Sequence, residues 1–240
     1  MTAGEGSTVS PEAEPSPEAE RPRATASPMA PAPAAAVEGA AGAMLVIISG
    51  PAGVGKDTIL RELKALPSAG RREFVVTYKS REPRWDEVDG VHYHFVSPER
   101  FHEIHRAGGL LEAAEVHGQW SGTPLDGVRR ALLAGRDAVL KIDVQGAAAI
   151  KEKVPGALRI FVSPPSIDEL RRRLVERNTE TPEQLAIRLH NAEIEMREAP
   201  RYDYTIVNVT ALDGAARSAR RIDELIDEEH GRRGARRIFV

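Results

Sequence analysis

The clearest chemical signal in this sequence is a glycine-rich run that ends in a lysine. The run consists of Gly50, Pro51, Ala52, Gly53, Val54, Gly55 and Lys56, and it fits G-x-x-x-x-G-K. Its backbone N–H groups and the start of a following helix can surround a polyphosphate, while the lysine neutralises the outer oxygens. An ordinary glycine turn is the alternative. The strand expected before the run and the helix expected after it favour a nucleotide site.

The residue after the lysine departs from the usual pattern. It is Asp57, where such loops have a Ser or Thr that binds Mg²⁺. A carboxylate can also hold the metal, directly or through water, and Thr58 offers a hydroxyl one residue later. We therefore expect Mg²⁺ as the cofactor, with Asp57 and Thr58 as candidate ligands, and the departure leaves the metal geometry open.

A second candidate site combines two arginines with a phenol. Arg81 and Arg84 flank Pro83, and Tyr93 follows in the run His92-Tyr93-His94-Phe95. Two guanidinium forks and a phenol can hold one phosphate dianion. Taken alone, such arginines are more often solvated surface charges, so this site depends on its context.

The elements that must position these residues alternate between strands and helices. Apolar runs typical of buried strands cover residues 44–49, 74–76, 138–140, 158–162 and 204–207. Helical patterns cover residues 59–66, 98–107, 125–134, 167–177, 182–197 and 212–229. This alternation indicates an α/β sandwich around a mainly parallel sheet, with the glycine-rich run leaving the first strand.

The two ends of the chain differ from the middle in composition. Residues 1–43 are almost wholly Ala, Pro, Glu, Gly, Ser and Thr, so they cannot bury enough apolar area to offset their ordering entropy. A transit peptide is the alternative, but six Glu against two Arg argue against it. Residues 230–240 contain two arginine pairs, for which a solvated basic tail is favoured over a nucleic-acid contact. We expect one domain over 44–229 between these tails, the first of them disordered.

Composition also limits the function. A length of 240 residues with 41% hydrophobic residues suits one core, and a net charge of -3 with a pI near 6.2 argues against nucleic-acid and membrane partners. The absence of cysteine excludes disulfides, thiolate catalysis and Cys-type zinc sites.

No stretch approaches eighteen consecutive apolar residues, and the N-terminus lacks a secretory pattern. We expect a soluble, cytoplasmic protein, and the sequence does not decide between monomer and homo-oligomer.

Six further motifs follow the glycine-rich run in the order seen in guanylate kinases. They are T-x-x-x-R-x-P-R from Thr77, E-V-x-G-x-x-Y-x-F from Glu87, L-E-x-A-E-V-x-G from Leu111, I-D-x-Q-G from Ile142, P-P-S from Pro164 and D-Y-x-I-V-N from Asp203. The sequence therefore resembles that family over about residues 44–229.

The resemblance implies both a fold and an activity. The fold is that of P-loop NTPases, a three-layer α/β sandwich with a mainly parallel central sheet. A small GMP-binding subdomain is expected over about residues 74–127 and a helical lid over about residues 168–190. The implied activity moves the γ-phosphoryl group of ATP to GMP and dGMP, in purine nucleotide metabolism and GMP recycling. ATP and GMP are then the partners.

The resemblance also assigns acceptor residues. Arg81, Arg84 and Tyr93 match residues that bind the GMP phosphate, and the base is expected to contact Thr77, Glu112, Thr123 and Asp143. Chemistry supports the two acidic residues, because guanine presents N1–H and N2–H donors side by side and a buried carboxylate accepts both. Adenine would place the lone pair of its N1 against the same charge, so the site would reject it.

On the donor side, the resemblance assigns ATP binding to the glycine-rich run with Asp57, Thr58 and Asn208. The expected catalytic residues are Lys56, Arg173, Arg177 and Arg188, the arginines closing with the lid over the transferring phosphoryl group. Arg171 and Arg172 are expected to face solvent, because consecutive residues fan around a helix. No catalytic histidine is required, since a phosphate oxygen is already a nucleophile.

Several positions depart from the family pattern. Lys79 lies in a stretch usually rich in Ser and Thr, and Trp120-Ser121 stands where the family has two tyrosines. Ser121 thus replaces a tyrosine that contacts phosphate, and Lys141 occupies a position that is often acidic. With Asp57, these changes bear on affinity and substrate choice.

Two other functions remain as alternatives. A ribose-bisphosphate kinase of the same fold can also have G-K-D in its phosphate loop, but it has no need of a base site made by Glu112 and Asp143. A non-catalytic guanylate-kinase-like binding module is the other, but such modules have typically lost the loop that Gly50, Gly55 and Lys56 retain here.

Overall fold

The computed structural model describes Met1 and residues 38–116, 118–176, 182–234 and 238–240. The chain divides into two units, Met1–Ala30 and Pro31–Val240, and every helix and strand below belongs to the second. The expected disordered tail falls mostly on residues 2–37, which lie outside the described residues.

A five-stranded parallel sheet forms the centre of the domain. Its strand order is β2-β7-β1-β8-β9, and every neighbouring pair runs parallel. The bounds are β1 Leu45–Ser49, β2 Arg72–Val75, β7 Asp137–Lys141, β8 Leu158–Ser163 and β9 Tyr204–Val207. All of β1 is buried, as expected of an apolar run that is covered on both faces.

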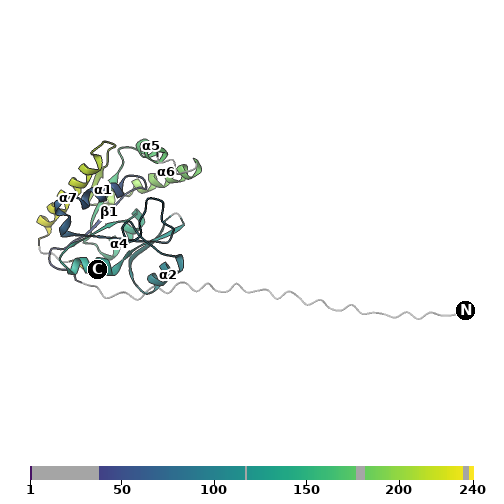
Figure 1. The fold of residues 1–240 in the computed structure, drawn as a ribbon, viewed down its shortest axis with the longest axis horizontal. Coiled ribbons are helices and arrows are strands. Elements are labelled where there is room, and N and C mark those ends of the chain that lie inside the picture. Colours follow the sequence, from purple (N-terminus) through teal and green to yellow (C-terminus); the bar gives the residue numbers. More distant parts are fainter. Residues whose placement is uncertain (2–37, 117, 177–181, 235–237) are drawn as a thin grey trace. The chain divides into compact units, whose positions relative to one another are not determined.

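Helices cover both faces of this sheet. Their bounds are α1 Lys56–Lys64, α3 Leu125–Leu133, α4 Val144–Lys153 and α7 Gly214–Arg233. Successive residues of β1 point to opposite faces, so Ile47 packs with α3 and α4 while Ile48 packs with α1 and α7. Figure 1 shows α1 and α7 together beside β1. The three-layer sandwich with a mainly parallel sheet is confirmed.

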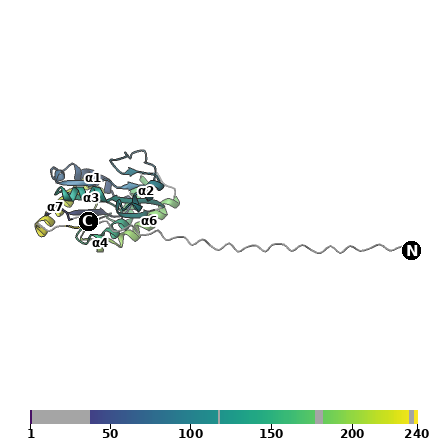
Figure 2. The same ribbon diagram turned by 90° about the horizontal axis from the view of Figure 1, so that it is seen from below.

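A smaller mixed sheet stands where the acceptor subdomain was expected. Its order is β4-β3-β6-β5, with β3 parallel to β4 and antiparallel to β6, and β5 antiparallel to β6. The bounds are β3 Tyr78–Lys79, β4 His94–Phe95, β5 Leu110–Val116, β6 Gln119–Pro124 and the adjoining α2 Pro98–Arg106. Phe101 of α2 is fully buried against this sheet, close to Gly122. In both Figure 1 and Figure 2, α2 lies on the side of the domain away from α7.

Two helices with a small core of their own occupy the expected lid. They are α5 Ile167–Glu176 and α6 Pro182–Met196, and they pack through Leu170, Leu174, Leu189 and Ala192. Leu174 also lies against the glycine-rich loop, because a side chain at Gly53 would approach its Cδ2 to 2.7 Å. The lid helices are therefore in contact with the phosphate loop as well as with each other. Two 3₁₀ turns, Pro67–Arg71 and Ala199–Arg201, complete the regular structure of the described residues.

The packed chain extends beyond the expected bounds of 44–229 at both ends. Glu38 and Phe239 form an antiparallel bridge, and the backbone N of Gly39 donates to the Ile238 carbonyl at 2.8 Å. Ile238 is buried and belongs to the same core cluster as the apolar residues of α3. The expected basic tail begins inside α7, which continues to Arg233.

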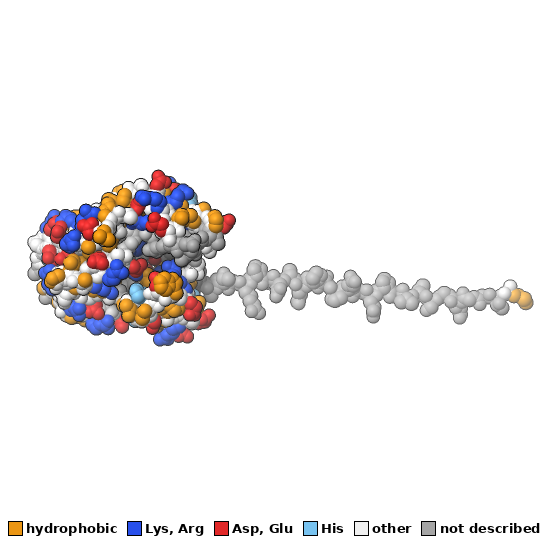
Figure 3. Space-filling model, turned by 45° about the horizontal axis from the view of Figure 1, so that its top comes forward, with side chains coloured by type: hydrophobic (Ala, Val, Ile, Leu, Met, Phe, Trp, Pro, Cys, Tyr) orange, Lys and Arg blue, Asp and Glu red, His pale blue; other side chains and the backbone are white. Residues whose placement is uncertain are grey.

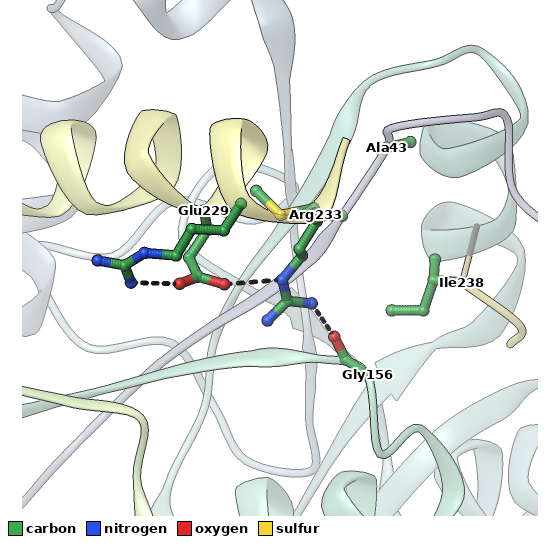
Figure 4. Close-up of a pocket in the computed structure, with 7 residues that line it drawn as sticks. Ala43, Gly156, Glu229, Arg233 and Ile238 are labelled. Carbon is green, nitrogen blue, oxygen red and sulfur yellow. Dashed lines mark hydrogen bonds and ion pairs between the residues drawn. The ribbon is translucent and has the colours of Figure 1, made fainter. Parts of the chain in front are cut away.

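A hollow in the surface lies beside these ends of the domain, and its lining residues bond to one another. In Figure 4, Glu229 and Arg233 of α7 face each other, and Arg233 also donates to the Gly156 carbonyl. The Arg233 Nε atom lies 2.8 Å from Glu229 Oε2. Although Glu229 is partly desolvated, its hydrogen bonds from Arg233, Tyr204 and Arg232 lower its pKa to about 2. None of the expected site residues lines this hollow.

Replacing Ile238 tests whether the C-terminal residues belong to the core. Ile238→Ala should lower the free energy of unfolding by about 2 kcal/mol, since it removes buried methyl groups and leaves a cavity. Phe239→Ala is the matched control, because this neighbouring side chain is 56% exposed and should change stability by less than about 0.5 kcal/mol. Urea unfolding of the full chain gives both values, and equal stabilities would contradict the assignment.

Candidate active site

The glycine-rich loop connects the carboxyl end of β1 to the first residue of α1, Lys56. Gly50 has φ 141°, and a side chain there would come within 2.1 Å of the Val162 carbonyl oxygen. Gly55 has φ 99°, and a side chain there would lie 2.7 Å from Asn208 Nδ2. The loop can therefore take this path only with glycine at both positions.

The Lys56 ammonium lies over the loop. Its Nζ donates to the carbonyl oxygens of Gly50 at 2.6 Å and Pro51 at 3.0 Å. Desolvation lowers the pKa of Lys56 to about 8, although the carboxylates of Glu195 and Asp57 oppose this shift. A bound phosphate would add negative charge beside the ammonium and so stabilise its charged form.

Two side chains hold the loop from behind through the carbonyl of Val54. The buried Asn208 donates to it from Nδ2 at 2.8 Å, and Arg173 of α5 donates from a guanidinium nitrogen at 3.2 Å. Arg173 also donates to the Asn208 carbonyl at 2.7 Å and to Thr210. Both residues were expected at the donor site, and the structure places both against the phosphate loop.

Glu195 of α6 is a site residue that sequence reasoning missed. Its half-buried carboxylate accepts from the backbone N of Ala52 and interacts with Lys56, while burial raises its pKa. A lone Glu within a helical pattern usually faces solvent, so only its position next to the folded loop reveals it. The carboxylate lies against the same backbone and ammonium groups that are expected to bind phosphate.

The other arginines of α5 and α6 differ in exposure. Arg188 is half-buried on α6, whereas Arg171 and Arg172 are exposed on α5 as expected. Arg172 pairs with Glu169. The predicted catalytic residue Arg177 lies outside the described residues.

The acceptor phosphate residues gather around Tyr93. Both terminal guanidinium nitrogens of Arg81 bind Glu87, at 2.6 and 2.7 Å, and the guanidinium lies 5.7 Å from the centre of the Tyr93 ring. These hydrogen bonds raise the pKa of Arg81, against the effect of its partial burial. Arg84 is exposed, and its backbone N donates to Glu87 at 2.8 Å. The structure thus brings Arg81 to Tyr93 and leaves the Arg84 side chain at the rim.

Three of the four expected base residues are buried, and the fourth, Asp143, is half-buried. Glu112 on β5 accepts a 2.7 Å hydrogen bond from the hydroxyl of Thr123, its direct partner on β6, and only 3% of Glu112 is exposed. Asp143 caps α4 by accepting from the backbone N of Gly146 at 2.8 Å, and Gly146 lies directly against Glu112. Thr77, between β2 and β3, is also buried.

Burial sets the protonation of this group. Desolvation raises the pKa of Glu112 to about 7, and the nearby Asp143 carboxylate raises it further, while the hydrogen bond from Thr123 opposes the shift. The pair of acidic residues therefore combines a half-buried carboxylate at a helix N-terminus with a buried carboxyl whose pKa is raised to about 7. Both can accept hydrogen bonds from a ligand when ionised.

The positions that depart from the family pattern lie in or beside these sites. Asp57 is exposed in the first turn of α1 and forms an ion pair with Lys141, whose Nζ also donates to the Tyr93 hydroxyl at 2.8 Å. Ser121 is buried on β6, opposite Lys79 of β3. Trp120 packs against α2, with its ring centre 5.8 Å from that of Phe101.

The Mg²⁺ expectation can be tested on the donor atoms. Among the described residues, no group of three or more acidic or histidine side chains could hold a metal by itself. Asp57 and Thr58 nevertheless offer a carboxylate and a hydroxyl at the mouth of the phosphate loop. Magnesium commonly takes one or two protein oxygens and completes its shell with phosphates and water, so these residues fit a metal that arrives with a nucleotide.

Two surface properties concern macromolecular partners. Within the described residues, no helix is both long enough and apolar enough to cross a membrane. On the face of the described residues drawn in Figure 3, basic and acidic side chains are interspersed rather than separated by sign. That face therefore lacks the continuous basic strip typical of nucleic-acid binding.

The chain is similar to known proteins in both sequence and fold. Residues 42–226 match the guanylate kinase family. The guanylate kinase of Lactococcus lactis subsp. lactis (strain IL1403) is 42% identical over 189 residues, which cover 79% of this chain and 89% of that protein. The guanylate kinase of Streptococcus pyogenes serotype M3 is 41% identical, covering 79% and 87%. The crystal structure of guanylate kinase from Anaplasma phagocytophilum superposes with a TM-score of 0.64 at 28% identity, covering 78% of this chain and 86% of that one.

Glu112 should make the stability of the fold depend on pH. A folded pKa of about 7, above the ordinary value of 4.5, means that Glu112 stabilises the fold most below pH 4.5 and that this contribution is lost as the pH rises through 7. Relative to Glu112→Gln, the wild type should lose on the order of 2 kcal/mol between pH 5 and pH 8. Urea unfolding of both proteins at the two pH values measures this difference, and parallel stabilities would contradict the raised pKa.

Proposed function

This chain belongs to the guanylate kinase family, and we propose that the residues described above perform its transfer of the γ-phosphoryl group from ATP to GMP. The observation that carries the proposal is the buried pair Glu112 and Thr123 with the half-buried Asp143 nearby, located in the same domain as a glycine-rich phosphate loop. Guanine offers two adjacent N–H donors that suit a carboxylate there.

On the donor side, residues 50–56 bind the phosphates of ATP through backbone N–H groups and the Lys56 ammonium. Asn208 fixes the loop and lies toward the adenine. When bound with ATP, Mg²⁺ neutralises charge on the β- and γ-phosphates, and Asp57 and Thr58 are the residues that would hold it. Asn208 already supports the loop from behind, so the loop itself needs little reorganisation on binding, whereas Arg173 would exchange the Val54 and Asn208 carbonyls for the transferring phosphoryl group.

On the acceptor side, Glu112 and Asp143 accept hydrogen bonds from the guanine edge, with Thr123 and Thr77 as further base contacts. Arg81, Arg84 and Tyr93 bind the GMP phosphate. Both guanosine and deoxyguanosine nucleotides present the same base edge and phosphate, so dGMP is also a substrate. An adenine or pyrimidine would leave buried polar groups unpaired.

In the transfer step, an oxygen of the GMP phosphate attacks the γ-phosphorus of ATP. The bond between that phosphorus and the β,γ-bridging oxygen breaks, so ADP leaves with the bond's electron pair and GDP forms. Lys56 and the lid arginines Arg173, Arg177 and Arg188 stabilise the charge on the transferring group. Closure of the lid would also keep water from the phosphoryl group.

No histidine takes part in this mechanism. His92 accepts from the backbone N of Val88 at 2.9 Å, and His230 lies 2.9 Å from Asp137 at the far end of β7, so both have structural partners. The acceptor's nucleophile is a phosphate oxygen and needs no general base. The proposed reaction belongs to purine nucleotide metabolism and GMP recycling, and its partners are ATP and GMP. We propose the cytoplasm as the compartment of the protein.

One observation supports the ribose-bisphosphate kinase alternative, the G-K-D sequence that ends at Asp57. A sugar phosphate would leave the buried Glu112 unmatched, which makes this alternative the weaker one. The binding-module alternative has to explain why the loop and Lys56 are intact.

A coupled assay of ADP release tests the proposal directly. With ATP and Mg²⁺, turnover should occur with GMP and dGMP and not with AMP, UMP, CMP or ribose bisphosphate. Glu112→Ala should reduce kcat/KM for GMP by 10²-fold or more, roughly the loss of a charged hydrogen-bonding partner.

Lys56→Ala should abolish ATP binding in an equilibrium measurement. Turnover with ribose bisphosphate alone would overturn the proposal, whereas ATP binding without turnover of any acceptor would favour the binding module.

Base binding should require the ionised form of Glu112. Because its pKa of about 7 lies in the neutral range, the affinity for guanosine should rise as the pH increases from 6 to 8. Guanosine is used in place of GMP because a nucleotide phosphate titrates in the same range. In Glu112→Gln, the dependence on pH should disappear. Calorimetric titration of both proteins checks this, and an unchanged pH dependence in the variant would assign the titration to another group.

A further inference from the structure

We propose that Lys141 binds the phosphate group of the acceptor nucleotide, and that Asp57 holds its ammonium in place until the acceptor arrives. This inference rests on the proposed function, because it takes the Tyr93 side of Lys141 as the acceptor site. It assigns a substrate contact to a position where the sequence departs from the family pattern.

The first observation is a concentration of positive charge around one ring. The centre of the Tyr93 ring lies 4.2 Å from the Lys141 ammonium, 5.5 Å from that of Lys79 and 5.7 Å from the Arg81 guanidinium. The three cations come from two segments of the chain, with Lys141 at the end of β7 and with Lys79 and Arg81 in β3 and the loop directly after it. Three cations around one phenol form a binding site that suits a phosphate dianion.

The charge of this group is incompletely balanced by the carboxylates bonded to it. Glu87 binds Arg81 in bidentate fashion, and Asp57 pairs with Lys141. Burial lowers the pKa of Lys79, which interacts with Asp143 and Glu112 without a hydrogen bond to either. An anionic ligand held next to Tyr93 would place negative charge beside all three cations.

The ion pair of Lys141 is strongly asymmetric. The Lys141 side chain is only 9% exposed, whereas that of Asp57 is 70% exposed. An exposed carboxylate is well hydrated, so exchanging it for another anion costs little. A buried ammonium, in contrast, needs an anionic partner at all times. The Lys141 ammonium can therefore exchange the Asp57 carboxylate for a phosphate while its positive charge stays paired with an anion.

The position of Lys141 supports a role at the point of transfer. It is the last residue of β7 and lies beside Ile48 of β1, the strand that leads into the phosphate loop. Its Nζ contacts the first turn of α1 through Asp57 and the acceptor group through the Tyr93 hydroxyl, at 2.8 Å. The ammonium is thus located between the donor and acceptor sites.

Calorimetric titration without metal can separate phosphate binding from base binding and from donor binding. The ligands are GMP, guanosine and ADP, and the proteins are the wild type, Lys141→Met, Lys141→Arg and the control Lys151→Met, which removes an exposed lysine of α4. Lys141→Met should raise the Kd of GMP at least roughly tenfold, the usual effect of losing a charged hydrogen bond. Its Kd for guanosine and ADP should stay the same, Lys141→Arg should retain most of the GMP affinity, and Lys151→Met should resemble the wild type.

A second variant tests the exchange itself. If Asp57 competes with phosphate for the ammonium, Asp57→Asn should bind GMP more tightly than the wild type in metal-free solution, by roughly twofold or more. A purely structural ion pair predicts no change in GMP affinity and only a lower melting temperature. Thermal unfolding of each variant therefore accompanies the titrations.

An unchanged GMP affinity in Asp57→Asn would overturn the exchange, and two results would overturn the phosphate contact of Lys141. One is an unchanged GMP affinity in Lys141→Met, and the other is a loss that appears with ADP but not with GMP, which would assign the ammonium to the donor. Both are distinct from a failure of the proposed function, in which the wild type itself would show neither GMP binding nor turnover.

Discussion

The active site depends on how the carbonyl groups of the phosphate loop are held. Lys56 takes the carbonyls of Gly50 and Pro51, and Asn208 with Arg173 takes that of Val54. These hydrogen bonds fix the loop in a path that only glycine permits at its turning points. The strands supply the frame for this arrangement, because β1 delivers the loop and β9 delivers Asn208 to the same edge of the sheet.

Charge is the second organising factor, and it links elements that share no core. The lid reaches the loop through Arg173 and Glu195, while Lys141 joins α1 to the acceptor residues. Each link pairs a half-buried or buried charge with a partner from another element, so each is sensitive to the arrival of an anionic ligand. Substrate binding and the relative positions of these elements are therefore coupled by electrostatics, in addition to the apolar contact between Leu174 and the loop.

The sequence predicted the parts of the fold whose stability comes from long apolar patterns. The run at residues 44–49 and the helical patterns after it are found as expected, and the α/β sandwich follows from their order. None of the four strands of the small sheet was expected. The strands β3 and β4 have two residues each and leave no periodicity to detect, and the longer β5 and β6 were also missed. Helix α4 was also missed, since its Ala and Gly residues form only a weak amphipathic pattern. Motifs located Glu112 and Asp143, but Glu195 and the convergence of lysines on Tyr93 depend on contacts between distant segments.

The pairing of β5 with β6 has a consequence for how base selectivity can evolve. Glu112 stands directly opposite Thr123, and an irregularity between Leu110 and Glu112 sets that alignment. In a strand, displacement by one residue turns every side chain to the other face. Inserting or deleting a single residue within the paired part of β5 or β6 would therefore turn Glu112 away from Thr123 and Gly146 without substituting any residue of the site. If Glu112 selects the base as proposed, the spacing of this hairpin matters to selectivity as well as the identity of its residues.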